Sequence, residues 1–179
     1  LDIAFLRTLD QENMFSGYAE LRQHSLLSGM EEWSRHINLD LMRPDYPLLG
    51  KMVAQSVAIK QRIVEEDPTE KGIRKALNLG HTVGHAFESL ALAENRTVLH
   101  GYAVAWGLVC ELYLSACKLG FPTSVLQQTL HFVRDNYGWF SIECKEYDRL
   151  YAYMTHDKKN EAGIINFTLL AAPGDIRIN

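Results

Sequence analysis

Three histidines are the residues of this sequence best suited to chemistry. His81 and His85 lie four residues apart, so in a helix their imidazoles stand one turn apart on the same face. Gly80 and Gly84 remove side-chain bulk there, so another helix, a metal ion or a substrate could approach closely. His100 follows at the start of another apolar segment. The pattern is compatible with a metal site or with structural histidines in the core.

Two carboxylates could complete such a site. A catalytic zinc ion usually takes three protein ligands and leaves one position open. His81, His85 and His100 could supply all three, or two of them could bind together with a carboxylate while the other faces a substrate. Glu20 stands among small residues, and Glu88 lies three residues after His85, where it could equally belong to a solvated helix face. The pair lacks the glutamate of HExxH, which argues against a metalloprotease.

Four basic residues suggest what the site would bind. Lys60, Arg74, Lys158 and Lys159 are spread along the sequence, but all are expected at element ends or in loops, where binding residues concentrate. Surface solubilisation is the alternative for each lysine. Arg74 lies seven residues before His81, and arginine suits bidentate capture of a carboxylate or phosphate. A metal ion and several cations together predict a small anionic, hydroxylated substrate.

Helices are expected to position these residues. Apolar periodicity, caps and breakers predict a mainly α fold, a multi-helix bundle with a small C-terminal β hairpin or extended tail. Residues 1–9 are expected to be a lead-in without stable structure, and residues 40–47, 94–99 and 157–160 to be loops. The predicted helices are residues 10–28, 30–38, 48–66, 73–92, 101–119, 124–137 and 146–154, followed by strand-like residues 164–170 and 176–178. No linker divides residues 1–179, so a single domain is expected.

Composition excludes several classes of protein. The chain has 179 residues and a net charge of −4, so no overall basic field indicates a nucleic-acid partner. Three cysteines at irregular spacing argue against a disulfide framework and favour a reducing cytoplasm. The longest apolar stretch, residues 103–116, is interrupted by Glu111 and is too short to span a membrane. No GxGxxG or P-loop occurs, so no nucleotide-binding half is expected in this chain.

The sequence around the histidines resembles that of the 3-dehydroquinate synthase family. The motif is LNxGHTxGHAxE, and it is far more specific than a bare histidine pair. The resemblance covers essentially the whole chain and is carried by residues 17–20 (GYAE), 59–67 (IKQRIVEED), 74–88 (RKALNLGHTVGHAFE), 100–107 (HGYAVAWG) and 157–159 (DKK).

The resemblance implies a two-domain enzyme of which this chain is the second domain. In that family an α/β domain binds NAD, and a largely helical C-terminal domain carries the metal ligands. The chain lacks an initiator methionine, so it is expected to be a fragment or a processed chain, inactive alone. The implied partners are the chain's own N-terminal NAD domain and a second subunit in a homodimer. The implied location is the cytoplasm, without membrane or nucleic-acid partners.

The resemblance also implies roles for individual residues. The metal ligands would be Glu20, His81 and His100, in place of a three-histidine set, and zinc, cobalt or iron would suit them. His85 would face the substrate phosphate and take part in proton transfer. Lys60 and Arg74 match the family's clamp for the substrate carboxylate. Asn78 matches a contact on the phosphate side, which Lys158 or Lys159 would join.

The implied activity is that of a lyase of the shikimate pathway of aromatic amino acid biosynthesis. It converts 3-deoxy-arabino-heptulosonate 7-phosphate to 3-dehydroquinate and phosphate. Transient oxidation by NAD acidifies a C–H bond, phosphate leaves, and an intramolecular aldol step closes the ring. Much of the catalysis would be positioning by the cationic groups.

One departure leaves alternatives open. The family usually has lysine three residues after the glutamate ligand, and here that residue is Gln23. A cationic contact with the substrate is therefore expected to be lost, which bears on activity and on the substrate. The alternatives are a sibling sugar-phosphate cyclase of the 2-deoxy-scyllo-inosose or epi-valiolone type, a more distant metal-dependent alcohol dehydrogenase, or a non-catalytic helical module that binds metal.

Overall fold

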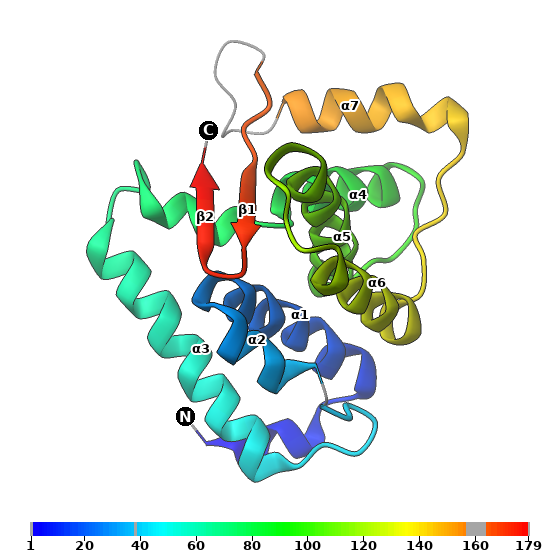
Figure 1. Ribbon diagram of the computed structural model, residues 1–179. Helices are drawn as coiled ribbons and strands as arrows, with labels where there is room; N and C mark the ends of the chain where they lie inside the picture. Colours follow the sequence, from blue (N-terminus) through cyan, green and yellow to red (C-terminus); the bar gives the residue numbers. More distant parts are fainter. Residues whose placement is uncertain (1, 38, 157–163, 179) are drawn as a thin grey trace.

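A long apolar helix lies at the centre of the structure. The computed structural model describes residues 2–37, 39–156 and 164–178 (Figure 1). Helix α5 (His100–Leu119) packs against α1, α4, α6 and strand β1. Its sequence is apolar on most faces, as expected of a helix surrounded by others, and Val104, Leu108 and Leu112 are almost fully buried. The mainly α prediction is therefore confirmed.

The N-terminal helices begin where the sequence places caps. Helix α1 (Gln11–Ser28) starts after Asp10, whose Oδ1 accepts a hydrogen bond from the Asn13 amide at 2.8 Å. It ends at Gly29, which has a φ of 126° and leads directly into α2 (Met30–His36). Helix α3 (Tyr46–Glu66) starts after Asp45, earlier than predicted, because Pro47 in the first turn has no amide to satisfy.

The prediction of an unstructured lead-in was wrong. Residues Ile3–Thr8 form a 3₁₀ helix, η1, and the Asp2 side chain accepts from the Ala4 amide at 2.9 Å. The Ile3 side chain lies against Gly50 of α3, where an added Cβ would be 3.0 Å from Ile3 Cδ1. A tertiary contact thus orders a segment whose local pattern is weak.

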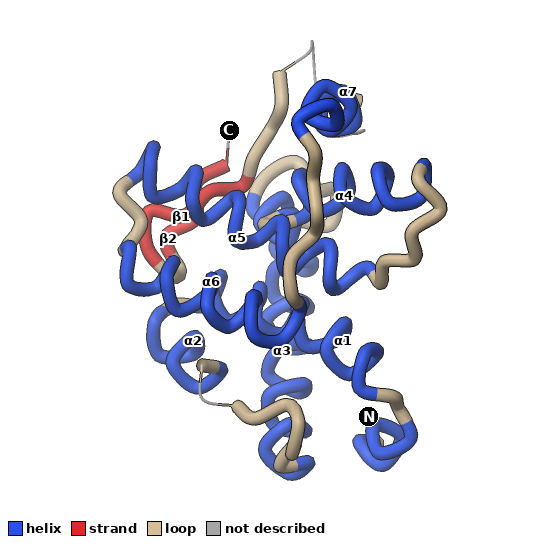
Figure 2. Tube along the Cα trace, turned by 90° about the vertical axis from the view of Figure 1, so that its right-hand side faces the viewer, coloured by secondary structure: helices blue, strands red, loops and turns tan. Residues whose placement is uncertain are grey.

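The remaining helices follow the predicted order. The 3₁₀ helix η2 (Ile73–Asn78) leads into α4 (His81–Ala93), and α6 (Thr123–Tyr137) follows α5 after a turn at Pro122. A short η3 (Cys144–Glu146) precedes α7 (Tyr147–Thr155), which packs along α4. Figure 2 shows α4 and α7 at one end of the molecule and the N-terminus at the other.

The C-terminal hairpin is integrated into the helical core. Strands β1 (Thr168–Ala172) and β2 (Asp175–Ile178) are antiparallel, with Thr168 opposite Ile178. The Leu170 amide donates to Ser115 Oγ of α5 at 3.0 Å, and the Gly174 amide donates to the Leu26 carbonyl of α1 at 2.8 Å. The first strand starts later than predicted, at Thr168.

Helix α5 alone, in the described part of the chain, is long and apolar enough to cross a membrane by length and composition. Its packing gives another explanation for the same composition. Nine of its twenty residues are buried against its neighbours, and one of these is Glu111, which is fully buried within the helical core. A core helix of this kind passes the same test, so the feature does not indicate a membrane protein.

Candidate metal and substrate site

Two glycines of α5 allow the helices that carry the site to meet. A Cβ on Gly107 would lie 2.1 Å from the Gly80 carbonyl oxygen, so α4 contacts α5 backbone to backbone. A Cβ on Gly101 would lie 1.9 Å from the Ser16 carbonyl oxygen, so α1 does the same on another side. Only glycine fits at such distances. The first turns of α4 and α5 and the middle of α1 therefore converge.

Three histidine rings meet where these helices converge. The centroids of His81 and His85 are 5.5 Å apart, those of His81 and His100 are 5.3 Å apart, and those of His85 and His100 are 6.0 Å apart. His81 and His85 come from the first turns of α4, and His100 is the first residue of α5. The structure therefore brings these three histidines together, and their sharing of one site stays a prediction.

Glu20 and Lys60 extend the cluster from the side of α1 and α3. Glu20 Oε1 lies 4.0 Å from His100 Nε2, and Glu20 Oε2 lies 3.8 Å from Lys60 Nζ. Both side chains are partly exposed, 41% for Glu20 and 55% for Lys60, so a ligand in solution could reach them. A carboxylate, an ammonium group and imidazoles thus face the same space.

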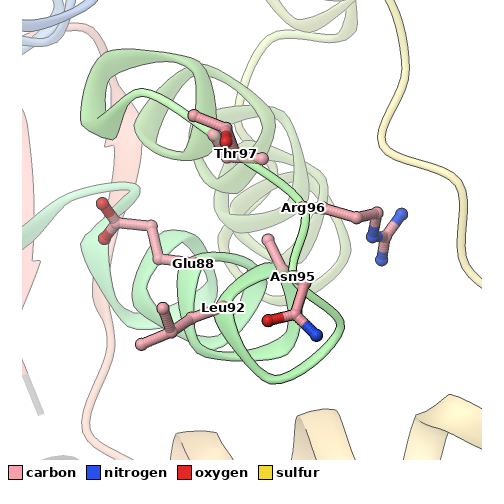
Figure 3. Close-up of a pocket in the computed structure, with 7 residues that line it drawn as sticks. Glu88, Leu92, Asn95, Arg96 and Thr97 are labelled. Atoms are coloured by element: carbon pink, nitrogen blue, oxygen red, sulfur yellow. The ribbon is translucent and has the colours of Figure 1, made fainter.

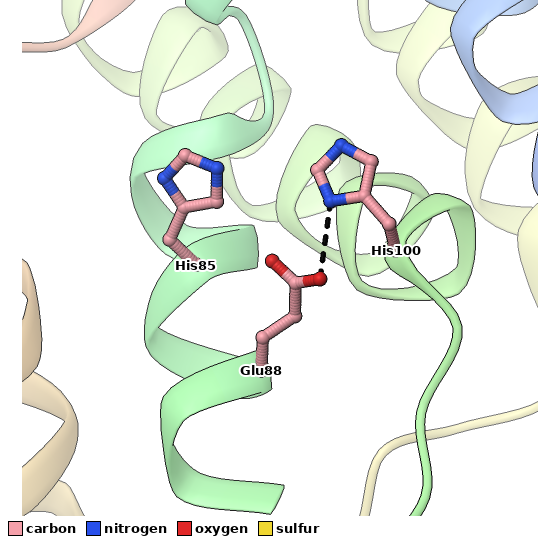
Figure 4. Close-up of side chains that lie close together, drawn as sticks. All are labelled: His85, Glu88 and His100. Atoms are coloured by element: carbon pink, nitrogen blue, oxygen red, sulfur yellow. Dashed lines mark hydrogen bonds and ion pairs between the residues drawn. The ribbon is translucent and has the colours of Figure 1, made fainter. Parts of the chain in front are cut away.

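Glu88 is also part of the cluster. Its Oε1 lies 3.1 Å from His100 Nδ1, within hydrogen-bonding distance, as Figure 4 shows. His85, Glu88 and His100 each offer one potential ligand atom, and these three atoms all lie within 4.8 Å of one another. Two candidate groups of metal ligands therefore overlap at His100: Glu20 with His81, and Glu88 with His85.

His81 is held by groups at the turn before α4. Its Nδ1 lies 3.3 Å from the Leu79 carbonyl oxygen and 3.3 Å from Gln23 Nε2. Gln23 Nε2 itself donates to the carbonyls of Leu77 and Leu79, both at 2.7 Å. Both amide hydrogens of Gln23 go to these two carbonyls, so none is left to donate to His81 Nδ1. The Leu79 carbonyl oxygen has two lone pairs, so it can accept from His81 Nδ1–H as well as from Gln23. The lone pair of His81 is then on Nε2, the nitrogen that would bind a metal.

Gln23 points into the protein. Its side chain is 1% exposed, and its amide contacts backbone carbonyls beside His81. The residue at this position thus supports the histidine turn. The expected loss of a cationic contact with the substrate stays a prediction.

A buried carboxylate caps α4. Glu111 of α5 is fully buried, and its two oxygens accept from the amides of Gly80 at 2.6 Å and Val83 at 3.1 Å. These amides belong to the first turn of α4, where backbone N–H groups have no acceptor within the helix. Glu111 therefore fixes the turn that carries His81 relative to α5.

Two other predicted residues make local contacts. Arg74 Nη1 donates to the Pro68 carbonyl at 2.8 Å, and the Arg74 amide donates to Asp67 at 3.1 Å. Asn78 Nδ2 donates to Glu70 at 3.0 Å. The turn after α3 thus contacts both residues. Lys158 and Lys159 lie outside the described residues.

A hollow of about 500 Å³ opens next to Glu88. Figure 3 shows that α4 and the following loop form its wall, while the Arg96 side chain points away from Glu88. Its lining residues are Glu88, Ala91, Leu92, Asn95, Arg96, Thr97 and Val98. Glu88 is therefore accessible from this side.

The donor set fits a divalent transition metal. Carboxylate oxygen and imidazole nitrogen suit zinc, cobalt and iron, and ligands on a tetrahedral ion lie about 3.4 Å apart when each bond is about 2.1 Å long. The 4.0 Å between Glu20 Oε1 and His100 Nε2 is close to that separation. The spacing of this pair is therefore compatible with both side chains binding one metal ion.

Two residues of the site were not assigned a role from the sequence. In the sequence Gln23 is only a departure from the family pattern, because its contacts with Leu77 and Leu79 cross more than fifty positions of sequence. Glu111 did leave a signal, because it is the acidic residue within an apolar stretch. A charge in such a stretch needs partners, and here these are the amides of α4.

A family model and three curated relatives of this chain carry the description 3-dehydroquinate synthase. A sequence model of the family described as 3-dehydroquinate synthase C-terminal matches residues 17–160. The 3-dehydroquinate synthase of Parabacteroides distasonis is 55% identical over 179 residues, which are 100% of this chain and 51% of that protein. Those of Leptospira interrogans and Staphylococcus aureus are 40% and 32% identical, over 99% and 98% of this chain and 50% and 49% of theirs. The chain therefore spans about half the length of these curated relatives.

Solved structures share the fold at lower identity. A 2-deoxy-scyllo-inosose synthase complexed with carbaglucose-6-phosphate, NAD+ and Co2+ matches with a TM-score of 0.78 and 20% identity, over 99% of this chain and 50% of that one. The 2-epi-5-epi-valiolone synthase of Streptomyces hygroscopicus, with NAD+ and Zn2+ bound, gives a TM-score of 0.76 and 20% identity, over 99% and 50%. On the match to the family and the sequence identities together, this chain belongs to the family of 3-dehydroquinate synthase C-terminal domains.

Proposed function

We propose that this chain is the metal- and substrate-binding half of a 3-dehydroquinate synthase. The activity is the conversion of 3-deoxy-arabino-heptulosonate 7-phosphate to 3-dehydroquinate and phosphate. The observation that carries the proposal is the convergence of Glu20, His81 and His100 from three different helices. The names of the curated relatives support the same substrate.

The metal centre consists of Glu20, His81 and His100, and zinc is the ion we propose, with cobalt or iron as chemically equivalent alternatives. A metal bound there supplies a Lewis acid that lowers the pKa of a coordinated substrate hydroxyl. Three protein ligands leave a position open for that hydroxyl. Lys60, beside Glu20, adds positive charge on the substrate side.

Positioning of the substrate falls to the polar groups around the cluster. Lys60 and Arg74 hold the substrate carboxylate, and Arg74 would exchange its bond to the Pro68 carbonyl for a bidentate one. His85, next to His81 and His100, faces the phosphate and takes part in proton transfer at its oxygens. Asn78 and one of Lys158 and Lys159 join the phosphate side.

The rest of the enzyme lies outside this chain. The chain spans about half of its relatives, so we propose that residues 1–179 form one domain and that an N-terminal domain supplies NAD, the hydride acceptor. A homodimer in the cytoplasm is the proposed state, without nucleic-acid or membrane partners.

Metal binding and turnover test this proposal in the complete two-domain protein. Zinc titration by calorimetry should show one tight site, which His81→Ala and Glu20→Ala abolish. Phosphate release from 3-deoxy-arabino-heptulosonate 7-phosphate should require NAD and metal. Lys60→Met should raise KM and lower kcat together, because Lys60 serves both binding and charge stabilisation.

Two outcomes would contradict the proposal in different ways. Turnover of a carboxylate-free sugar phosphate, with no turnover of the heptulosonate, would identify a sibling cyclase instead. Metal binding without turnover of either substrate would identify a non-catalytic metal-binding module.

A further inference from the structure

Glu88 and Glu20 contact opposite nitrogens of the same imidazole. His100 Nδ1 lies 3.1 Å from Glu88 Oε1, and His100 Nε2 lies 4.0 Å from Glu20 Oε1. The first distance is that of a hydrogen bond, whereas the second is too long for one. Glu88 is therefore hydrogen-bonded to the His100 ring, whereas Glu20 lies near it without a hydrogen bond.

A neutral imidazole carries its hydrogen on one nitrogen only. If His100 Nδ1 carries it, this nitrogen donates to Glu88, and the lone pair of Nε2 faces Glu20. If Glu88 were instead a metal ligand together with Nδ1, that nitrogen would need its lone pair for the metal. The two arrangements exclude each other, so the tautomer of His100 decides between the two overlapping groups of ligands.

The surroundings favour a hydrogen on Nδ1. His81 shows the same arrangement, because its Nδ1 lies 3.3 Å from the Leu79 carbonyl oxygen. In Figure 4 the second ring nitrogen of His100 points away from Glu88. Both histidines would then use Nε2 as the ligand atom, and Glu20 supplies an oxygen beside His100.

We propose that Glu88 is a positioning residue, which accepts the Nδ1 hydrogen of His100 and so directs its Nε2 toward Glu20 and His81. Glu88 does not bind the metal itself. A carboxylate that accepts from a metal-binding histidine fixes the ring's orientation and increases its basicity. The proposal rests on the proposed metal centre, and it adds a role for Glu88, which is 30% exposed and could have been a solvated helix residue.

The tautomer itself can be measured without a metal. Long-range ¹H–¹⁵N spectra of the histidine-labelled, metal-free complete protein at mildly alkaline pH distinguish hydrogen on Nδ1 from hydrogen on Nε2. His100→Gln assigns the signal. His100 should carry hydrogen on Nδ1 in the wild type and in Glu88→Gln, whose amide oxygen still accepts, and should become a mixture in Glu88→Leu. Hydrogen on Nε2 in the wild type would overturn the proposal, as would an unchanged tautomer in Glu88→Leu.

Cobalt binding provides the second readout. The visible spectrum of bound Co2+ should be unchanged in Glu88→Gln and altered in Glu20→Gln. Affinity in Glu88→Leu should fall about 10- to 100-fold, the usual effect of losing such a partner. His85→Ala should still bind Co2+, whereas His81→Ala should not. The reverse pattern, with binding dependent on Glu88 and His85, would overturn the proposal.

The two measurements also distinguish failure of the proposed function from failure of the proposed role of Glu88. A wild type that binds no metal, while His100 still carries its hydrogen on Nδ1 in a Glu88-dependent way, would remove the metal centre from the proposed function. The positioning of His100 by Glu88 would then still stand.

Discussion

Gln23 Nε2 lies 2.7 Å from the Leu79 carbonyl oxygen, and the same oxygen lies 3.3 Å from His81 Nδ1. A side chain of α1 thus supports the turn that presents a candidate metal ligand on α4. The amide nitrogen also donates to the Leu77 carbonyl at 2.7 Å, so one donor group holds two successive parts of the turn.

Replacing Gln23 by leucine should destabilise the fold. The change leaves two carbonyls of the turn without their donor, and an unsatisfied buried group costs about 1–3 kcal/mol. We expect the free energy of unfolding to fall by about 2–4 kcal/mol in urea denaturation. Gln128→Leu, at an exposed position of α6, is the matched control, because the same exchange there breaks no buried hydrogen bond. Equal losses of stability in the two leucine variants would contradict the proposed role of the Gln23 hydrogen bonds.

Replacing Glu111 should loosen the first turn of α4. Glu111→Gln keeps one acceptor oxygen and places an amide donor against the other backbone N–H, so one of the two hydrogen bonds is lost. Glu111→Ala loses both and also the negative charge at the helix N-terminus. We expect losses of about 2 and 4 kcal/mol respectively, with faster hydrogen exchange at the amides of Gly80 and Val83. Equal stability of the two variants would contradict this account.

Local patterns predicted most of the fold. Asp10 caps α1 as its residue type suggests, and the apolar run after His100 forms the central helix. Residues 1–9 were mispredicted because Ile3 is ordered by a contact with Gly50, distant in sequence. Local propensity contains no information about such a contact.

The candidate site was predictable only where it depends on local spacing along one helix. The spacing of His81 and His85 indicated a common helix face, and the structure brings their rings to 5.5 Å. The partner of each histidine nitrogen could not be predicted, because hydrogen bonds such as that between Glu88 and His100 depend on how α4 and α5 cross. That crossing is set by glycines whose role becomes visible only once both helices are in place.

Gly107→Ala should separate α4 from α5. The new Cβ would lie 2.1 Å from the Gly80 carbonyl oxygen and 2.6 Å from the Gly84 amide nitrogen, so the backbones must move apart. We expect a loss of at least about 3 kcal/mol in unfolding free energy and weaker metal binding, since overpacking typically costs about 1–3 kcal/mol when side chains alone adjust.

Gly17→Ala is the matched control for that prediction. Gly17 lies in helix α1, and a Cβ there would meet nothing within 4 Å. Alanine is the better helix former by about 1 kcal/mol, so this variant should be slightly more stable than the wild type. If the two variants lost stability equally, close helix contact would not be the reason for Gly107.

Two buried histidines should make stability depend on pH. Burial lowers the pKa of His24 and of His36 to about 4, below the usual value of 6.5. Between these pH values the unfolded chain binds more protons than the folded protein. The stability that these two histidines contribute is therefore fully present above pH 6.5 and is lost as the pH falls toward 4. Each shift corresponds to about 3 kcal/mol at the acid end of that range. His24→Gln should reduce the slope of unfolding free energy against pH, measured in urea at several pH values. The exposed His131 provides the control, and a His131→Gln variant with the same reduction would show that burial is not the cause.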